Sequence, residues 1–159
     1  MPNNRLEYLT ANDWVLMSAR SVRLIFTPGQ SIIEEGARGE AVYVIRKGTA
    51  LVVLALVSGK KPLAKLGPGD ICGDMAYLEK GNATASVVAE EEVEVDRIPT
   101  AELDSLFQAF PGLASRFYRS LAVVLARRLR DTSAQLGREF RRPDRNASPG
   151  PPTEPPRQR

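Results

Sequence analysis

From position 21 to position 99 the apolar residues occur in short runs that glycines interrupt. Two neighbouring runs, 41–46 and 49–57, contain alternating apolar and polar side chains, and Gly48 separates them. Alternation with a period of two is typical of strands, and a glycine between two such runs indicates a hairpin turn. We expect strands near 22–26, 30–33, 41–46, 49–57, 62–66, 83–89 and 92–98. Short strands at this spacing, with no long helix between them, indicate a sandwich, jelly roll or barrel.

After Pro99 the apolar residues recur with a helical period. Thr100 resembles the cap of a first short helix, and Pro111 stands at the favoured first-turn position of a second helix. The second helix is long, roughly 30 residues, and its apolar residues are spaced by threes and fours as one stripe. The stripe consists of Phe117, Leu121, Leu125, Leu129, Thr132, Leu136 and Phe140.

A roll of this size covers only the first turns of so long a helix. We therefore expect the remaining apolar stripe to pair with a second copy, which makes the protein a homodimer. A monomer whose helix folds fully back onto its own roll is the alternative. The charged residues expected to flank the helix seam are Arg116, Arg119, Arg127, Arg128, Arg130 and Asp131.

The chain divides into four segments by pattern. Residues 1–20 form an N-terminal helical segment, in which Thr10 to Asp13 is typical of a capped helix start. Residues 21–99 form the roll, and residues 100–142 form the C-terminal helices. Residues 143–159 contain half of the 12 prolines among Ser, Gly, Asn and Arg. Such a composition buries little apolar surface, so we expect this tail to be disordered.

The net charge of +3 arises at the C-terminal end of the chain. Basic and acidic residues cancel over residues 1–137, whereas residues 138–159 carry six arginines against three acidic residues. A nucleic-acid-binding core would present a basic face, and this one is neutral. The stretch after the long helix is also too short for a helix-turn-helix domain. We therefore expect no specific DNA binding.

The residue types present argue against most enzyme chemistry. The sequence contains no histidine, which excludes histidine-dependent triads and histidine-ligated metals, and its one cysteine, Cys72, lies in an apolar setting. A carboxylate pair remains as an alternative, but the run 90–94 reads as a solvated turn. We expect a binding protein without a metal. The sequence lacks a membrane-length apolar run and a signal-peptide pattern, which indicates a cytoplasmic location.

One segment, 66–78, combines features of an anion site. A glycine turn leads to a short strand, then to Gly73 and to Asp74 at the start of a short helical turn. Unpaired backbone N–H groups at a helix start suit a phosphate, and glycine permits close approach of a ligand. Asp74 either caps the turn or accepts a hydrogen bond from a ligand hydroxyl.

These residues, with 31–36, 41–48 and 66–70, resemble the cyclic nucleotide-binding domain family, and the resemblance runs from about Thr10 to Leu136. It implies a mainly β fold: an eight-stranded antiparallel roll or jelly roll with a short N-terminal and a long C-terminal helix. It also implies a phosphate-binding cassette that begins at Gly73, with Asp74 where the family's glutamate contacts a ribose hydroxyl. The ligand-binding residues so implied are Gly73, Asp74, Met75, Ala76, Ala83, Thr84 and Ala85.

The chain departs from the family pattern at one position. Ala83 stands where the family has an arginine that binds the cyclic phosphate. Hydrogen bonds to charged groups contribute about 1.5–3 kcal/mol, so its loss weakens binding by about one to two orders of magnitude. This argues against cAMP as an ordinary ligand, although Lys80 is a candidate substitute cation. Two hypotheses follow: a regulatory module that senses a nucleotide or other small anion and signals to a partner protein, or a degenerate roll kept as a dimerisation or docking scaffold.

Overall fold

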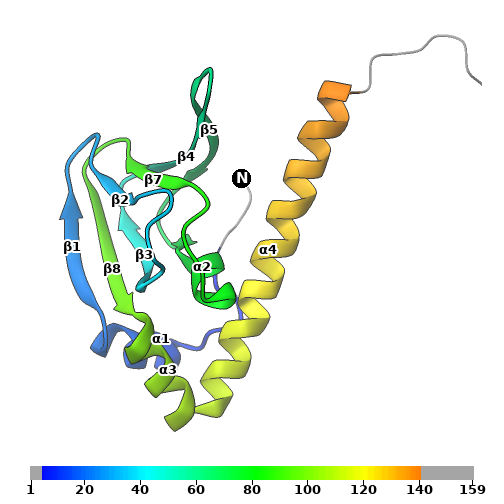
Figure 1. The fold of residues 1–159 in the computed structure, drawn as a ribbon. Coiled ribbons are helices and arrows are strands. Elements are labelled where there is room, and N and C mark those ends of the chain that lie inside the picture. Colours follow the sequence, from blue (N-terminus) through cyan, green and yellow to red (C-terminus); the bar gives the residue numbers. More distant parts are fainter. Residues whose placement is uncertain (1–4, 141–159) are drawn as a thin grey trace, which may run out of the picture.

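Two four-stranded antiparallel sheets and four helices make up residues 5–140, the part of the chain that this computed structural model describes (Figure 1). One sheet has the strand order β1 (Val22–Phe26), β8 (Val93–Pro99), β3 (Ala41–Lys47), β6 (Ile71–Cys72). The other has the order β2 (Ser31–Ile33), β7 (Ser86–Ala89), β4 (Ala50–Leu56), β5 (Gly59–Leu66). The helices are α1 (Ala11–Ala19), α2 (Asp74–Glu79), α3 (Thr100–Ala109) and α4 (Pro111–Phe140).

The mainly β fold with a long C-terminal helix is the one that the sequence predicts. Seven expected strands are present, and the eighth, β6, is too short at two residues to produce a periodic signal. Two boundaries differ by three residues: the strand expected over 83–89 begins only at Ser86, and the strand expected over 62–66 begins earlier, at Gly59. Gly48 forms the expected turn: its φ of 82° is left-handed, and a Cβ there would overlap the Glu92 carbonyl oxygen.

Strand β3 separates two hydrophobic cores, because its side chains alternate between its two faces. Tyr43 and Ile45 pack between the two sheets, in the interior of the roll. Val42 and Val44 point to the opposite face, where they contact the core formed by the helices. The helical core includes Met17, Leu103, Leu106, Leu113, Phe117 and Leu121. The helices therefore cover the outer face of the sheet that contains β3.

The helix starts show one correct and one incorrect cap prediction. Thr10 caps α1 as expected: its Oγ1 accepts from the Asp13 backbone N–H (3.1 Å), and Asp13 accepts from the Thr10 N–H (2.9 Å). Thr100 does not cap α3; the cap is Pro99, and Thr100 is the first helical residue. The Thr100 N–H donates to the Glu40 carbonyl oxygen (2.9 Å), so tertiary contact replaces a side-chain cap.

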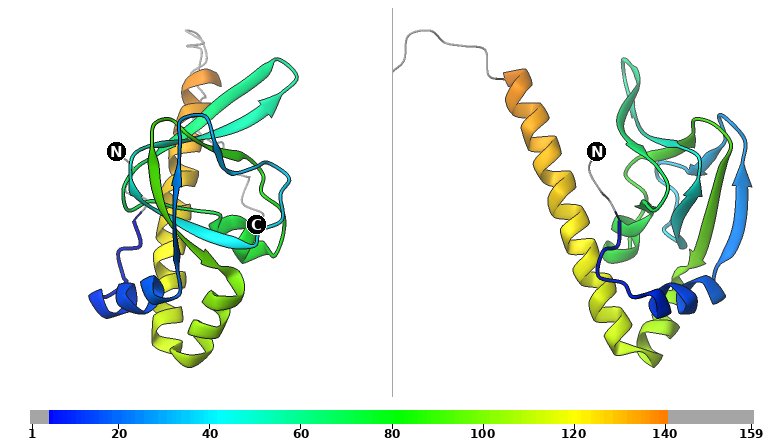
Figure 2. Two further views of the ribbon diagram at one scale, coloured as in Figure 1. Left: turned by 90° about the vertical axis from the view of Figure 1, so that its left-hand side faces the viewer. Right: turned by 180° about the vertical axis from the view of Figure 1, so that it is seen from behind.

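Helix α4 starts at Pro111, as predicted, and passes along the helical core and α2 before its distal end extends away from the roll (Figures 1 and 2). Its buried residues are Leu113, Phe117, Ser120, Leu121 and Val124. From Leu125 onward no α4 side chain in the described chain is fully buried. The prediction that the roll covers only the first turns of this helix is confirmed. The tail predicted over 143–159 lies outside the described residues.

Among residues 5–140, none of the helices combines the length and the apolar character needed to cross a lipid bilayer.

Candidate functional site

The segment that leads into α2 needs glycine for steric reasons within the protein. Gly73 has a φ of 80° and occupies the N-cap position of α2. A Cβ at this position would lie 2.8 Å from the Ala41 carbonyl oxygen and 3.3 Å from Cδ1 of Ile33. Gly73 therefore allows the β6–α2 turn to pack closely against β3 and β2. This internal contact accounts for the glycine without a ligand.

Asp74 is the first residue of α2, and its side chain does not cap the helix. The carboxylate is only 2% exposed and forms an ion pair with Arg128 of α4. Nη1 of Arg128 donates to both carboxylate oxygens, at 3.2 and 3.1 Å, and Nη2 donates to the Ile71 carbonyl oxygen at 2.7 Å. The capping role considered for Asp74 is wrong, because Arg128 satisfies the carboxylate.

Sequence reasoning placed Arg128 at the seam between two copies, and the structure places it against α2 of its own chain. A signal for this position exists in the sequence. Arg128 follows Leu121 by seven residues and Val124 by four, so it continues the stripe that faces the roll. A basic residue on an apolar stripe indicates a buried acidic partner.

The remaining cassette residues of α2 have different environments. Met75 is exposed, whereas Ala76 is buried against Gly39, where a Cβ on the glycine would come within 2.7 Å of the alanine Cβ. Tyr77 donates a hydrogen bond to Asp104 of α3 (2.7 Å), and its hydroxyl lies 3.4 Å from that of Tyr118 on α4. Burial and these two neighbours raise the pKa of Tyr77, so the phenol stays protonated. Helix α2 is thus bonded to both C-terminal helices.

The end of the cassette is held by backbone hydrogen bonds to the loop between β2 and β3. The Gly36 N–H donates to the Ala83 carbonyl oxygen (2.7 Å), and the Ala83 N–H donates to the Ala37 carbonyl oxygen (2.8 Å). These bonds explain why 83–85 lies outside β7. Ala83 and Ala85 are half-buried, while Thr84 is exposed.

Lys80, the candidate substitute cation, ends α2 in the left-handed conformation with a φ of 53°. Its side chain is exposed, and the structure gives it no ion pair within residues 5–140. It is therefore available to an anion that approaches the end of α2.

We expect Cys72 to resist modification in the folded protein. Its thiol lies in the interior of the roll, where burial raises its pKa to about 12, so the reactive thiolate is scarce at pH 8. Titration with a chromogenic disulfide reagent should give no rapid reaction in buffer and one equivalent in guanidinium. Rapid release of one equivalent from the native protein would contradict this prediction.

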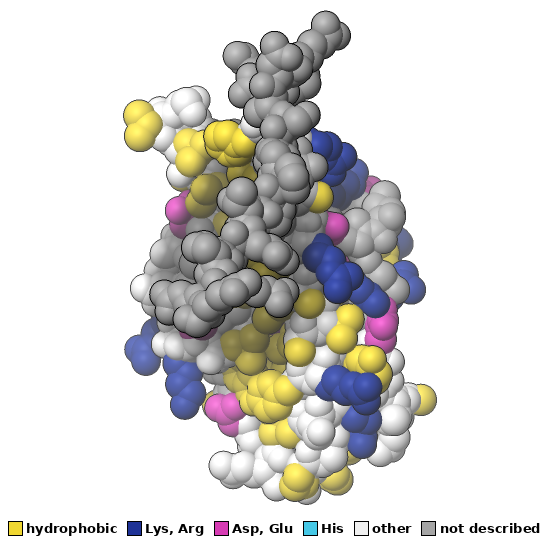
Figure 3. All heavy atoms as spheres, turned by 90° about the vertical axis from the view of Figure 1, so that its right-hand side faces the viewer, with side chains coloured by type: hydrophobic (Ala, Val, Ile, Leu, Met, Phe, Trp, Pro, Cys, Tyr) yellow, Lys and Arg dark blue, Asp and Glu magenta, His cyan; other side chains and the backbone are white. Residues whose placement is uncertain are grey.

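The apolar stripe predicted for the long helix divides between two faces of α4. Phe117 and Leu121 are buried in the chain's own core, which corrects their assignment to a dimer seam. Leu125 is half-buried, and the distal apolar residues are exposed: Leu129 by 69%, Leu136 by 48% and Phe140 by 82%. Figure 3, viewed from the α4 side, shows hydrophobic side chains gathered on this face of the molecule.

Exposed positions of α4, together with the half-buried Leu125, form a seam of their own. Tyr118, Ala122, Leu125, Leu129, Thr132 and Leu136 follow one another at alternating spacings of four and three residues. That spacing is the a/d pattern of a coiled coil, in which the stripe faces a partner helix. We call these six residues the α4 seam.

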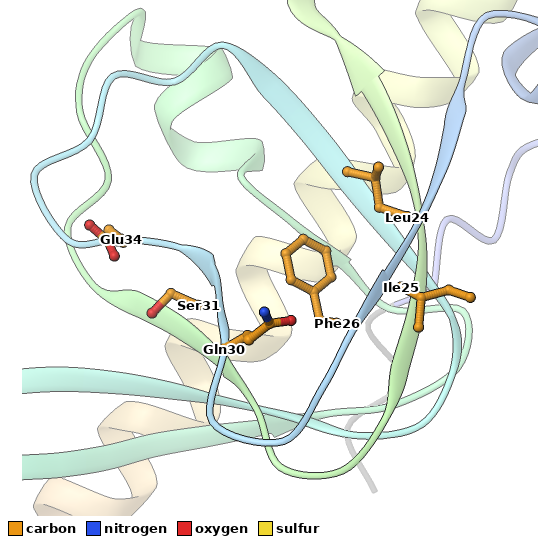
Figure 4. A pocket seen from close by; sticks show the side chains of 6 residues that line it. All are labelled: Leu24, Ile25, Phe26, Gln30, Ser31 and Glu34. Atoms are coloured by element: carbon orange, nitrogen blue, oxygen red, sulfur yellow. The ribbon is translucent and has the colours of Figure 1, made fainter.

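A separate hollow of about 410 Å³ lies between the edge strands β1 and β2 (Figure 4). Its lining comes from Leu24, Ile25, Phe26, Gln30, Ser31 and Glu34, and includes no cassette residue. No group of three or more Cys, Asp or Glu residues with metal-binding geometry occurs in the described part of the chain.

Comparisons with known proteins identify relatives of this fold. The sequence profile of the family described as "Cyclic nucleotide-binding domain" matches residues 23–110. The "Cyclic AMP receptor protein" of Thermus thermophilus is 32% identical over 115 residues, which cover 72% of this chain and 51% of that protein. The chain thus spans about half the length of this curated relative.

Solved structures show the same architecture. The Catabolite Activator Protein of Thermus thermophilus matches with a TM-score of 0.69 and 30% identity, over 82% of this chain and 60% of the other. A cyclic nucleotide-binding domain from Methylobacillus flagellatus matches with a TM-score of 0.77 over 83% of this chain and 75% of the other. Its identity is 20%, so this second match shows similarity of fold alone.

Proposed function

Because this chain belongs to the cyclic nucleotide-binding domain family, we propose that it is a ligand-sensing regulatory module rather than an enzyme. Its ligand is a cyclic nucleotide or a related nucleotide, bound between the cassette (73–86) and the roll. The observation that carries this proposal is the contact between Asp74 in the cassette and Arg128 in α4. Through it, the ligand-binding segment and the long helix are joined by direct hydrogen bonds, as a sensor requires.

The cassette favours a weak or unusual cyclic nucleotide ligand. At Ala83 the chain presents a methyl group in place of the guanidinium that binds phosphate in the family, and Lys80 is exposed at the other end of the same loop. An ammonium group binds phosphate as a point charge, without the paired geometry of arginine.

Calorimetric titration with cAMP, cGMP and cyclic di-GMP tests the proposal. We expect saturable binding of one of these ligands at micromolar to millimolar concentration. The Ala83→Arg variant should bind that ligand with an affinity at least about tenfold higher, because a charge-assisted contact to the phosphate is restored. Val57→Asp, at the exposed tip of the β4–β5 turn, is a control that should not change affinity. No heat of binding for either the unaltered chain or Ala83→Arg at millimolar ligand would reject the proposal.

A second function, a roll retained as a scaffold, is favoured by one observation: the Asp74 carboxylate is already satisfied within the chain. The scaffold hypothesis expects Asp74→Asn to leave both assembly and partner binding unchanged. The sensor hypothesis expects the same variant to alter ligand affinity.

We infer that the partner of the distal half of α4 is a second copy of this chain. The α4 seam has coiled-coil spacing, and its apolar residues from Leu129 onward are exposed. Exposed leucines in a row on a helix gain about 1.5–3 kcal/mol each when buried. A parallel or antiparallel pair of α4 helices provides that burial symmetrically.

A further inference from the structure

The hairpin of β4 and β5 extends from the roll as an arm (Figure 1). Strand β5 lies at the edge of its sheet, with β4 as its neighbour. Every β5 residue from Gly59 to Lys65 is exposed, and Leu66 at its end is buried. The side chains of this arm are therefore available to a partner outside the chain.

The tip of the hairpin is apolar. Strand β4 ends at Leu56 and β5 begins at Gly59, so Val57 and Ser58 form the turn. Two-residue turns favour Gly, Asn and Asp, and a valine contributes nothing to their geometry. Val57 is fully exposed, and Leu56 beside it is 44% exposed. The fold of the single chain gives Val57 no packing role, which points to a contact outside the chain.

Lysines follow the tip on both faces of the hairpin. Lys60 and Lys61 pair with successive residues of β4. Because neighbouring strand residues point to opposite faces, each face carries one ammonium group close behind the tip. Neither lysine has an ion pair within residues 5–140, whereas Lys65, nearer the base of the hairpin, pairs with Glu90 at 2.9 Å.

The charge around the hairpin has one sign. Residues 41–69 contain five basic residues and no acidic residue. Lysines on an edge strand also prevent pairing with another sheet, but that protection does not require an apolar tip. Single-stranded nucleic acids bind where cations accompany aromatic side chains, and residues 50–66 contain no aromatic residue. A bilayer surface with anionic headgroups matches both features, since its headgroups attract cations and its acyl boundary accepts apolar groups.

The distal end of α4 lies at the same end of the molecule as the hairpin tip, and α1 lies at the opposite end (Figures 1 and 2). This end of α4 carries Phe140, which is 82% exposed and lies outside the α4 seam, and the exposed Arg138. Two elements that are separate in the sequence thus place an apolar residue and a cation at one end of the molecule.

We propose that the tip of the β4–β5 hairpin, residues 56–61, is a docking surface for membranes with anionic headgroups. Val57 enters the boundary between headgroups and acyl chains, and Lys60 and Lys61 bind headgroups on either side of it. The distal end of α4 adds to the contact. This function goes beyond ligand sensing, because the hairpin tip lies outside the cassette.

Co-sedimentation of the full chain with vesicles tests the charge requirement. We expect binding to phosphatidylcholine mixed with phosphatidylglycerol, weakened by salt, and none to phosphatidylcholine alone. Each basic residue near an anionic surface strengthens binding about fivefold. The double variant Lys60→Glu with Lys61→Glu should therefore bind at least about 25-fold more weakly.

The variant Arg38→Glu with Lys47→Glu is the matched control, because it changes the charge equally at exposed residues outside the hairpin. It should weaken binding far less. Absence of binding to the mixed vesicles would overturn the proposal. Equal binding by the hairpin variant and the unaltered chain would also overturn it, since the contact would then belong to the arginines of residues 138–159.

A polarity-sensitive fluorophore attached at Val57→Cys tests insertion of the tip with both lysines in place. Cys72 is buried, so the label should react at position 57. We expect a blue shift of emission with the mixed vesicles and none with phosphatidylcholine alone. Val15→Cys is the control, because Val15 is 66% exposed on α1 at the opposite end of the molecule. No shift at position 57, or equal shifts at both positions, would overturn insertion of the hairpin tip.

Discussion

Replacing Asp13 with asparagine is expected to lower the free energy of unfolding by about 3 kcal/mol, because it breaks the ion pair between a buried carboxylate and the partly exposed Arg116. The Asp13 carboxylate on α1 is almost fully buried and accepts from Nε and Nη2 of Arg116 on α4, each at 2.7 Å. It also accepts from the Thr10 N–H. The pair joins the first helix to the last, so its loss affects the whole helical layer. Urea unfolding at pH 7 measures the change.

The same variant should reduce the dependence of stability on acid. The hydrogen bonds from Arg116 hold the pKa of Asp13 well below its ordinary value. In the unfolded chain that pKa is about 3.9. Stability from this group is therefore complete above about pH 4 and is lost as the pH falls toward the folded-state pKa. The unfolding free energies of the two proteins should converge between pH 4 and pH 2.

An exposed ion pair provides the control for this prediction. Arg20 and Glu102 join α1 to α3 at 3.1 Å, with both side chains well exposed. Glu102→Gln should change stability by less than about 1 kcal/mol. Asp96 is buried and bonded to Arg23 and Arg46, and its pKa is also lowered. The unaltered protein and the Asp13→Asn variant therefore share the part of the pH dependence of stability that comes from Asp96. Curves that stay parallel down to pH 2 would show that Asp13 is not the titrating group.

The roll itself could be predicted from the sequence because each of its determinants is local. Alternating apolar residues define β3 and β4, and Gly48 has the left-handed φ that the turn between them requires. Pro111 marks the start of α4 for an equally local reason, the fixed φ of proline at a first helical turn. Such signals do not depend on which segments meet in the folded chain.

The chemistry of the cassette could not be predicted in this way, because it depends on a contact between distant segments. Asp74 and Arg128 are 54 positions apart. The apolar stripe of α4 indicates an acidic partner for Arg128, but no local pattern identifies that partner as Asp74. The failed caps at Asp74 and Thr100 have the same origin. At Asp74 the carboxylate is satisfied by Arg128, and at Thr100 the backbone N–H at the helix start donates to the Glu40 carbonyl oxygen, so neither helix start depends on a side-chain cap.

The apolar stripe of α4 illustrates a further limit. Apolar residues spaced by threes and fours can lie on either of two adjacent faces of one helix. From the sequence alone they were predicted to form a single stripe. The structure separates a roll-facing stripe through Phe117, Leu121 and Val124 from the α4 seam. Arg128 ends the first stripe and Leu129, the next residue, lies on the second. The helix therefore places a cassette contact and a candidate interface side by side.

Replacing Leu129 and Leu136 with aspartate is expected to convert the protein from a dimer to a monomer. The two leucines lie at equivalent positions of successive heptads, seven residues apart, and are exposed in the single chain. In a paired seam each substitution would bury an unpaired charge twice, once in each copy. Light scattering should give twice the chain mass of 17.4 kDa for the unaltered protein and the single mass for the variant.

Val57→Asp is the matched control, since Val57 is an apolar residue that is fully exposed but lies outside α4. This variant should keep the dimer mass, which would show that one more surface charge does not by itself prevent association. A single-chain mass for the unaltered protein, or a dimer mass for the double aspartate variant, would remove the α4 seam as the dimer interface. Because the Asp74 carboxylate bonds to Arg128 and to neither leucine, both variants should keep the contact between α2 and α4. The interface and the cassette contact then separate experimentally, although they occupy neighbouring residues of one helix.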